Sequence, residues 1–273
     1  MPSPLRIGTL APPPAAGPGG QPTAYVEKAP PAHLTEVVAG SWLGRAGWER
    51  RLRVLPDGCT ELVWNGRRLW VVGAIRSAVW EPVSPAAESV GIRLRPGVAG
   101  MVLGCPASEL PGRLTAVETL WGPAAGLWEE KLAHAPTAAA RRVLLEDLVG
   151  RRLAGREPDQ VTLAAAALAA SSANVDAIAD GVSLSSRQLR RRFHEQVGYG
   201  PKTLHRVLRF QRFVRRLPAL AGGSSLAVAA AEPGYADQSH LGRECQELAG
   251  SSPRSLVRRW AAQREVGRNL PDR

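Results

Sequence analysis

The sequence is poor in cysteine, and its three cysteines lie far apart, at Cys59, Cys105 and Cys245. They form no Cys-x-x-Cys pair and are odd in number, so neither a disulfide framework nor a thiolate metal site is expected. No His-x-His motif and no close cluster of His and Glu is present in the sequence. We therefore expect no metal ion and no cofactor.

Long apolar runs are also missing. No stretch of about 18 apolar residues occurs, which argues against a membrane span. The first residues, MPSPLRIGTLAPPPAAG, hold only a broken apolar run and too much proline for a signal peptide. The expected location is therefore the cytoplasm, in contact with the nucleoid. Residues 1–24 are expected to form a disordered tail rich in Pro, Ala and Gly.

Lysine is scarce as well. Only Lys28, Lys131 and Lys202 are present, so arginine carries almost all of the positive charge. The formal net charge is +11, and residues 156–273 contain 18 basic against 11 acidic residues. This balance favours a polyanionic partner, nucleic acid before an anionic membrane surface. Arginine is also the side chain whose planar fork fits phosphate or guanine.

The order of local patterns predicts an α+β chain. Strands are expected over residues 51–55, 61–64, 67–72 and 89–95, with turns at Pro56-Asp57-Gly58 and at the Asn65-Gly66 hairpin. Helical patterns follow, most clearly over 124–134 and 138–153. We predict a small antiparallel β domain with helices over residues 25–155, an all-α domain over 156–262, and a basic tail over 263–273.

A first helix-turn-helix unit is predicted over about residues 174–198. Asn174 suits the N-cap of a short support helix, and Ser185 suits the N-cap of the next helix. Leu184 and Leu189 flank this second cap as a hydrophobic staple. The apolar stripe of the second helix falls at i, i+4 and i+8, namely Leu189, Phe193 and Val197.

The same pattern returns about 52 residues later, over about residues 225–250. Ser225 and Asp237 are the expected N-caps, and Pro233-Gly234 is the break between the helices. The buried stripe of the second helix is expected at Leu241, Cys245 and Leu248. Between the two units, residues 201–217 predict one continuous linker helix about 24 Å long. Such a rod can place two recognition helices about one DNA turn apart.

These motifs resemble the AraC/XylS family of transcription regulators. The stretch VDAIADGVSLSSRQLRRRFHEQVGYGPKTLHRVLRFQR is similar to the first family motif. The stretch SLAVAAAEPGYADQSHLGRECQELAGSSPRSL is similar to the second, with its GYxDxSHLxRE core. The resemblance covers about 100 residues and implies a sequence-specific DNA-binding regulator of bacterial type. Three departures are Ser183 in place of a frequent Gly, Cys245 in place of Phe, and Pro233 before the Gly.

The resemblance and the helical faces together nominate the DNA-contacting residues. Double-stranded DNA is the expected partner, and RNA polymerase is a further one. Base contacts are expected from Arg187, Gln188, Arg190 and Arg191 in the first unit and from Gln238, Ser239, His240 and Arg243 in the second. Phosphate contacts are expected from Ser185, Arg209 and Arg212. His240 has a capping or packing role as its alternative.

Seven of the eight tryptophans precede residue 150. The segments RVLPDGCTELVW and VGIRLRPG are similar to a domain that precedes AraC-type motifs, and family analogy suggests a cupin-like sensory and dimerisation domain. We expect an apolar or aromatic small-molecule effector bound at Trp42, Trp64, Trp70 and Trp80. The alternative is a constitutive regulator in which this domain is only a structural or homodimerisation module. In that case Trp64 and Trp70 form a cross-strand pair.

Two other classes of protein fit these residues less well. An AraC-type DNA-repair methyltransferase needs a nucleophilic cysteine in a Pro-Cys-His-Arg setting. Here Cys105 precedes Pro106 and Cys59 precedes Thr60, so an enzyme is not expected. A non-specific architectural protein needs only phosphate contacts and does not explain two capped recognition helices of different sequence.

Overall fold

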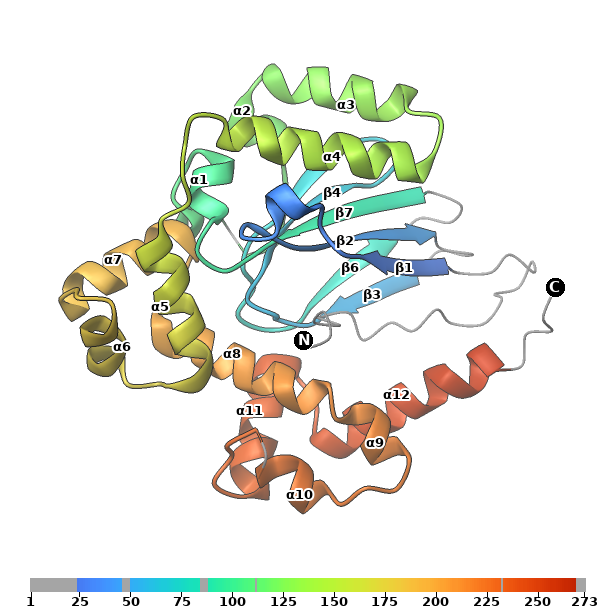
Figure 1. Ribbon diagram of the computed structural model, residues 1–273. Helices are drawn as coiled ribbons and strands as arrows, with labels where there is room; N and C mark the ends of the chain where they lie inside the picture. Colours follow the sequence, from blue (N-terminus) through green and yellow to red (C-terminus); the bar gives the residue numbers. More distant parts are fainter. Residues whose placement is uncertain (1–23, 46–49, 84–87, 111, 232, 269–273) are drawn as a thin grey trace.

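The structure is a computed structural model that describes residues 24–45, 50–83, 88–110, 112–231 and 233–268. The predicted tail over residues 1–24 therefore falls, up to residue 23, outside the described residues. The α+β class is confirmed: an antiparallel β part with helices on one side is followed by a part built from helices (Figure 1). No described helix is both long enough and apolar enough to cross a membrane.

The β part consists of two antiparallel sheets. The larger has the strand order β1-β2-β7-β4-β5-β8, and the smaller pairs β3 with β6. The strands are β1 (Ala24–Lys28), β2 (Val38–Arg45), β3 (Arg50–Val54), β4 (Thr60–Trp64), β5 (Leu69–Val72), β6 (Val79–Val83), β7 (Glu88–Leu94) and β8 (Leu114–Ala116). Strands β3, β4, β5 and β7 lie close to the four strands predicted from the sequence, whereas β1, β2, β6 and β8 had not been predicted.

Strand alternation gives the larger sheet two different faces. One face carries Leu62, Val71 and Ile92, all fully buried, and packs against α4 (Ala138–Leu153). Helix α3 (Ala124–His134) lies beside α4 (Figure 1). The opposite face carries Trp42, and a Cβ at Gly91 would lie only 2.2 Å from its indole. Gly91 is therefore required for the close approach of this ring to the sheet.

The hairpin between β4 and β5 differs from its prediction. Trp64 pairs with Leu69, so the loop has four residues rather than two. The side-chain oxygen of Asn65 accepts hydrogen bonds from the backbone N–H groups of Arg67 and Arg68, at 3.1 and 2.9 Å. This register places Val63, and not Trp64, opposite Trp70. The predicted cross-strand pair of Trp64 and Trp70 is therefore wrong, because the two rings lie on opposite faces.

The remaining helices follow the predicted order. Short helices α1 (Ala99–Leu103) and α2 (Glu118–Trp121) precede α3. The carboxy-terminal part contains α5 (Gln160–Ser171), α6 (Val175–Gly181), α7 (Ser186–Gln196), α8 (Pro201–Val214), α9 (Leu217–Ala221), α10 (Leu226–Ala231), α11 (Gln238–Ala249) and α12 (Pro253–Arg268). Helices α6 and α7 form the first helix-turn-helix unit, and α10 and α11 form the second.

Two predicted boundaries need correction. The linker helix α8 ends at Val214 rather than at residue 217, because Pro218 has no N–H for the carbonyl of Val214 and its ring would clash there. The chain bends at Arg215 and continues as α9. At the other end, α12 extends to Arg268, so much of the predicted tail over 263–273 is helical.

The β part supplies a core residue to the helical part. Leu55, which follows β3, is 1% exposed and packs with Val207, Phe210 and Phe213 of α8. The side-chain amide of Gln211 donates to the carbonyl oxygen of Pro56 at 2.6 Å. Burial of a leucine is worth about 1.5–3 kcal/mol. The two parts of the chain are therefore one packed unit at this point.

We predict that Leu55→Ala lowers the free energy of unfolding by about 2–5 kcal/mol, because it leaves a cavity on α8. Tryptophan fluorescence, which reports mainly on the β part, and far-ultraviolet circular dichroism should shift together in urea. The matched control is Leu127→Ala, since Leu127 is 65% exposed and its loss should change stability by less than about 0.5 kcal/mol. Equal effects of the two variants would contradict the shared core.

Candidate nucleic-acid interface

The first helix-turn-helix unit is capped as its sequence predicts. The side-chain oxygen of Asn174 accepts from the backbone N–H groups of Asp176 and Ala177, at 3.0 and 3.2 Å. At the start of α7, Ser185 and Gln188 form a reciprocal capping box. These contacts satisfy the open N–H groups at both helix starts and fix where each helix begins.

The backbone is strained at Ser183, in the turn between α6 and α7, where the sequence has serine in place of a frequent glycine. Ser183, at the position where related motifs often have glycine, has φ = 55° and is the one non-glycine residue with positive φ among those described. An L-residue in this left-handed region costs about 1–2 kcal/mol relative to its preferred conformations. The surrounding helices hold it there, since the backbone N–H groups of Ser183 and Leu184 both donate into the end of α6.

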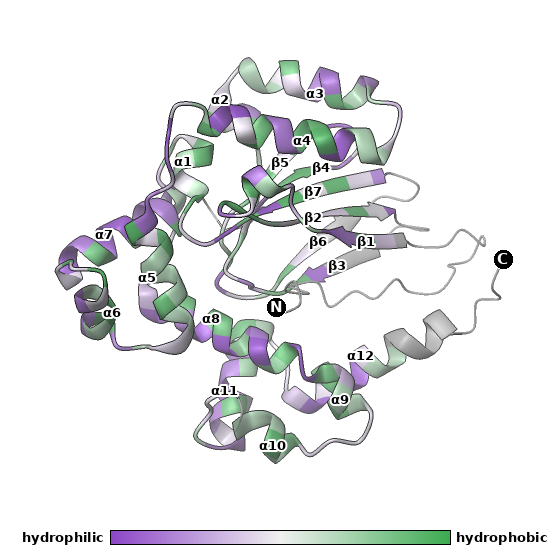
Figure 2. Ribbon diagram, in the orientation of Figure 1, coloured by the Kyte–Doolittle hydropathy of each residue, from purple (hydrophilic) through white to green (hydrophobic). Residues whose placement is uncertain are grey.

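Helix α7 has one apolar and one charged face. Leu189 and Phe193 are fully buried against α5 and α6, while Arg187, Arg190 and Arg191 are exposed. Most of the α7 ribbon is hydrophilic (Figure 2). Arg192 points elsewhere, because it forms an ion pair with Asp159 at the start of α5. The three exposed arginines form the basic surface that a recognition helix needs.

Gln188 and Ser185 have structural roles in addition to their predicted DNA contacts. The side-chain oxygen of Gln188 accepts from the backbone N–H and the hydroxyl of Ser185, both at 2.9 Å. Both residues are exposed on the outer surface of the unit. A base contact by Gln188 would have to come from its amide N–H₂, because its oxygen is used in the capping box.

The second unit has the same construction. Asp237 accepts from the backbone N–H of His240 at 2.6 Å and starts α11. Leu241, Cys245 and Leu248 are buried, as predicted. Burial raises the pKa of the Cys245 thiol to about 12, so this cysteine is a packing residue and not a reactive thiolate. Gln238, Ser239 and Arg243, all nominated for base contact, are exposed.

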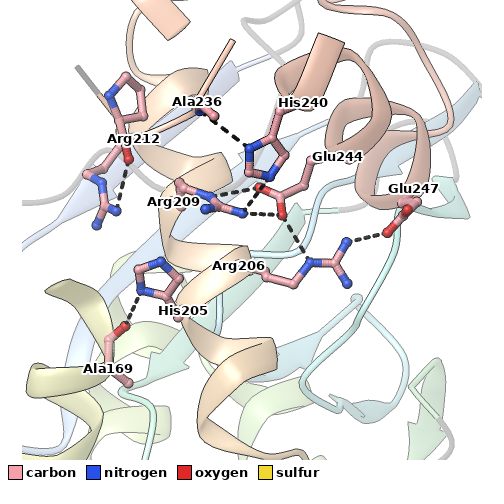
Figure 3. Close-up of polar contacts among 10 residues, drawn as sticks. Ala169, His205, Arg206, Arg209, Arg212, Ala236, His240, Glu244 and Glu247 are labelled. Carbon is pink, nitrogen blue, oxygen red and sulfur yellow. Dashed lines mark hydrogen bonds and ion pairs between the residues drawn. The ribbon is translucent and has the colours of Figure 1, made fainter. Parts of the chain in front are cut away.

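His240 faces the protein as well as the solvent. Its Nε2 lies 3.3 Å from the guanidinium of Arg209, and its Nδ1 lies 3.4 Å from the backbone N–H of Ala236 (Figure 3). Its ring also meets the ring of Tyr235 edge to face. These contacts favour the packing alternative that the sequence left open for His240.

Arg209 and Arg212, two of the predicted phosphate contacts, are engaged inside the protein. Arg209 donates to both carboxylate oxygens of Glu244, at 2.6 and 3.0 Å (Figure 3). Arg212 donates to the carbonyl oxygens of Ala170 and Pro233. Both side chains are half-buried because their face of α8 is packed against α5 and the second unit. Both side chains therefore bridge elements of the protein, and their phosphate contacts stay a prediction.

The sequence did not indicate the cluster that Arg209 joins. Glu244 accepts from Arg206 and Arg209, and Arg206 also pairs with Glu247. One signal was available: Glu244 follows Leu241 by three residues and precedes Leu248 by four, so it falls on the buried face of α11.

The four tryptophans proposed as a pocket do not share one surface. Trp64 is 1% exposed and fills the core between the larger sheet and α4. Trp80 lies on β6 of the other sheet, 49% exposed, with the Arg53 guanidinium 5.6 Å from its ring centroid. Trp42 and Trp70 do share a face, separated by Gly91 and Val63 in one row across the sheet. No metal-ligand cluster occurs among the described side chains.

Comparisons with known proteins agree with this architecture. Residues 178–259 match the family model described as a helix-turn-helix domain, and residues 26–115 match a domain of unknown function, DUF6597. A search of curated proteins finds no match.

Among solved structures, ToxT from Vibrio cholerae O395 is similar at 11% identity, over 79% of this chain and 90% of that chain, with a TM-score of 0.40. A P21 crystal form of ToxT from Vibrio cholerae gives 10% identity over 87% and 97%, also with a TM-score of 0.40.

We predict that Ser183→Gly raises the free energy of unfolding by about 0.5 kcal/mol, because relief of the left-handed strain exceeds the added chain entropy of glycine. Urea unfolding measures this difference. Ser224→Gly is the control, since Ser224 is exposed and does not have positive φ. That variant should lose a few tenths of a kcal/mol. A loss of stability in Ser183→Gly would show that the turn is not strained.

Proposed function

We propose that this chain, with a helix-turn-helix domain behind a DUF6597 domain, is a DNA-binding transcription regulator of the AraC type in which α7 and α11 each read one half of the site. The outer face of α7 presents Arg187, Arg190 and Arg191, and that of α11 presents Gln238, Ser239 and Arg243. The two sets differ in charge and shape. The site is therefore a non-palindromic pair of unlike half-sites.

The linker helix supports this proposal. Helix α8 has 14 residues, so it is about 21 Å long, and it joins the two units directly. Packing of α5 and α11 on α8 holds both units on one rigid element. Two helices fixed in this way can enter successive major grooves on one side of the duplex, about 10 base pairs apart.

The observation that carries the proposal is the pair of capped helices with exposed polar faces and buried apolar faces. The test is selection of bound sequences from a random DNA library, followed by footprinting of the selected site. We expect two unlike half-sites about one helical turn apart on a site bound by one subunit. A footprint with a single contacted groove, or no selected sequence at all, would contradict it.

The effector also belongs to the proposal. Trp42 and Trp70 share the face of the sheet that lies away from α4, and their indole nitrogens are buried without a hydrogen-bond partner among the described residues. A buried N–H without a partner costs about 1–3 kcal/mol, which a ligand acceptor would recover. We infer an aromatic or apolar effector with one acceptor atom that lies between these rings. Trp64 and Trp80 are not part of this site.

A constitutive regulator is the second candidate. Leu55 and Pro56 already fix the β part on α8 without a ligand, which is the observation that favours it. In that case the β part would brace the DNA-binding domain and serve as a dimerisation module. RNA polymerase and a second copy of the chain remain proposed partners in both candidates, and the cytoplasm remains the proposed location.

For base reading, we predict that Ala substitution of at least one of Arg187, Arg190 and Arg191 weakens binding to the selected site by about 1–3 kcal/mol and relaxes preference at one base pair. The reason is loss of a forked contact to guanine O6 and N7. Fluorescence anisotropy with single-base variants of the site measures both effects. Arg151→Ala is the control, because Arg151 is exposed on α4, outside both helix-turn-helix units, and pairs with Asp147. Three Ala variants that all bind like wild type would refute the assignment.

For the effector, we predict that a panel of aromatic metabolites contains a ligand that changes both tryptophan fluorescence and DNA affinity. Trp42→Phe and Trp70→Phe keep an aromatic ring but remove the indole N–H, so each should weaken that ligand by about five- to tenfold. Trp80→Phe is the control and should leave ligand affinity unchanged. If no ligand changes either signal, the constitutive candidate stands.

A further inference from the structure

Glu244 is a carboxylate buried at the contact between the linker helix and the second recognition helix. Its side chain is 3% exposed. Its oxygens accept from Arg206 Nε at 3.0 Å and from both Nε and a terminal nitrogen of Arg209 (Figure 3). The two arginines lie three residues apart on α8 and thus on one helix face. One side chain of α11 therefore bonds to two side chains of α8 that lie about one helical turn apart.

The charges in this cluster are balanced. Arg206 also pairs with Glu247, so two guanidinium groups meet two carboxylates. The Arg209 guanidinium also lies 4.8 Å from the centroid of the Tyr235 ring. Burial alone would raise the pKa of Glu244, but hydrogen bonds from Arg209 and Arg206 hold this pKa below its ordinary value. Glu244 is therefore ionised at neutral pH, and its removal would leave Arg209 unpaired at the interface.

Helix α11 also packs on α8 through Leu241, Leu248 and Ala249, but such apolar contacts are not directional. Its central core residue is Cys245, which is small and buries little apolar area. Arg243 directly precedes Glu244 and is exposed. Since successive residues are separated by about 100° around a helix, the rotation that seats Glu244 also sets the direction of Arg243.

We propose that Glu244 is a positioning residue for DNA recognition, which fixes the rotation of α11 on α8 and so aligns the second recognition helix with the first. This inference rests on the proposed function, in which α11 reads the second half-site. The cluster also keeps Arg206 and Arg209 away from phosphates. Loss of Glu244 thus has two expected consequences, weaker reading of the second half-site and one newly available cationic group, Arg209, because Arg206 keeps its pair with Glu247.

The test uses the full chain and three DNA duplexes: the selected site, the same site with its second half scrambled, and the same site with its first half scrambled. For Glu244→Gln we expect about tenfold weaker binding to the selected site. Binding to the duplex with a scrambled second half should not fall. The dependence of affinity on salt should become steeper by about one phosphate contact, because Arg209 is released while Arg206 keeps its pair with Glu247.

The matched control is Glu247→Gln, since Glu247 is 61% exposed and, among the described residues, pairs with Arg206 alone. It should leave affinity and salt dependence close to wild type. Arg209→Gln tests the pair from the other side and should give the same half-site-specific loss. The double variant Arg209→Gln/Glu244→Gln should bind less weakly than the product of the single losses predicts, because the two residues act through each other. Thermal unfolding of each variant checks that it is folded.

The outcomes separate the inference from the proposed function. If wild-type affinity does not change when the second half-site is scrambled, α11 does not read DNA and the proposed function fails. If wild type depends on that half-site and folded Glu244→Gln binds all three duplexes like wild type, the positioning role of Glu244 is wrong. An equal loss on all three duplexes would also overturn it, since that pattern indicates a general structural defect.

Discussion

Apolar packing around α8 is the interaction on which the rest of the structure depends. Leu204, Val207, Phe210 and Phe213 of this helix are all fully buried, and they face different neighbours. Leu204 lies in the core of the first helix-turn-helix unit, whereas Phe210 and Phe213 lie in the core of the second. One helix thus supplies both small cores. Movement of either unit away from α8 would open a cavity in one of these cores, so apolar packing holds both units on the one helix.

The polar face of α8 explains why net charge is a poor guide to the DNA surface. Arg206, Arg209 and Arg212 add three positive charges to this part of the chain, yet all three bridge internal elements. Exposed arginines lie instead on α7, at Arg243 of α11, after α8 at Arg215 and Arg216, and on α12 at Arg254, Arg258 and Arg259. The arginines of a basic helix can therefore serve to join it to carboxylates and carbonyl oxygens of neighbouring elements. Composition gives the sign of the protein's electrostatic field, but it does not show which charged side chains face the DNA.

What the sequence could predict depended on the distance between the interacting residues. Caps at Asn174, Ser185 and Asp237, and the apolar stripe of α7, are decided within one or two helical turns and were predicted correctly. The end of α8 was predictable in principle, because Pro218 is four residues beyond Val214. The pairing of Arg209 with Glu244 spans 35 residues and requires the angle between two helices. Trp64 and Trp70 lie on opposite faces whether the loop has two residues or four, so the Asn65-Gly66 hairpin already argued against a cross-strand pair.

The turn that follows β3 links the interior of the β part to α8. Asp57 lies in this turn, 3.9 Å from the guanidinium of the buried Arg93, and accepts from the backbone N–H of Cys59 at 2.8 Å. Burial, opposed by Arg93, raises the pKa of Asp57 to about 6. Pro56 and Leu55, on the other side of the same turn, contact Gln211 and the α8 core. A group that competes with Asp57 for Arg93 would therefore disturb the turn itself. Leu55 and Pro56, which contact α8, precede Asp57 directly in the chain. A ligand can shift the DNA-binding part only through a difference in its contacts with two arrangements, and this turn provides a short path for such a difference.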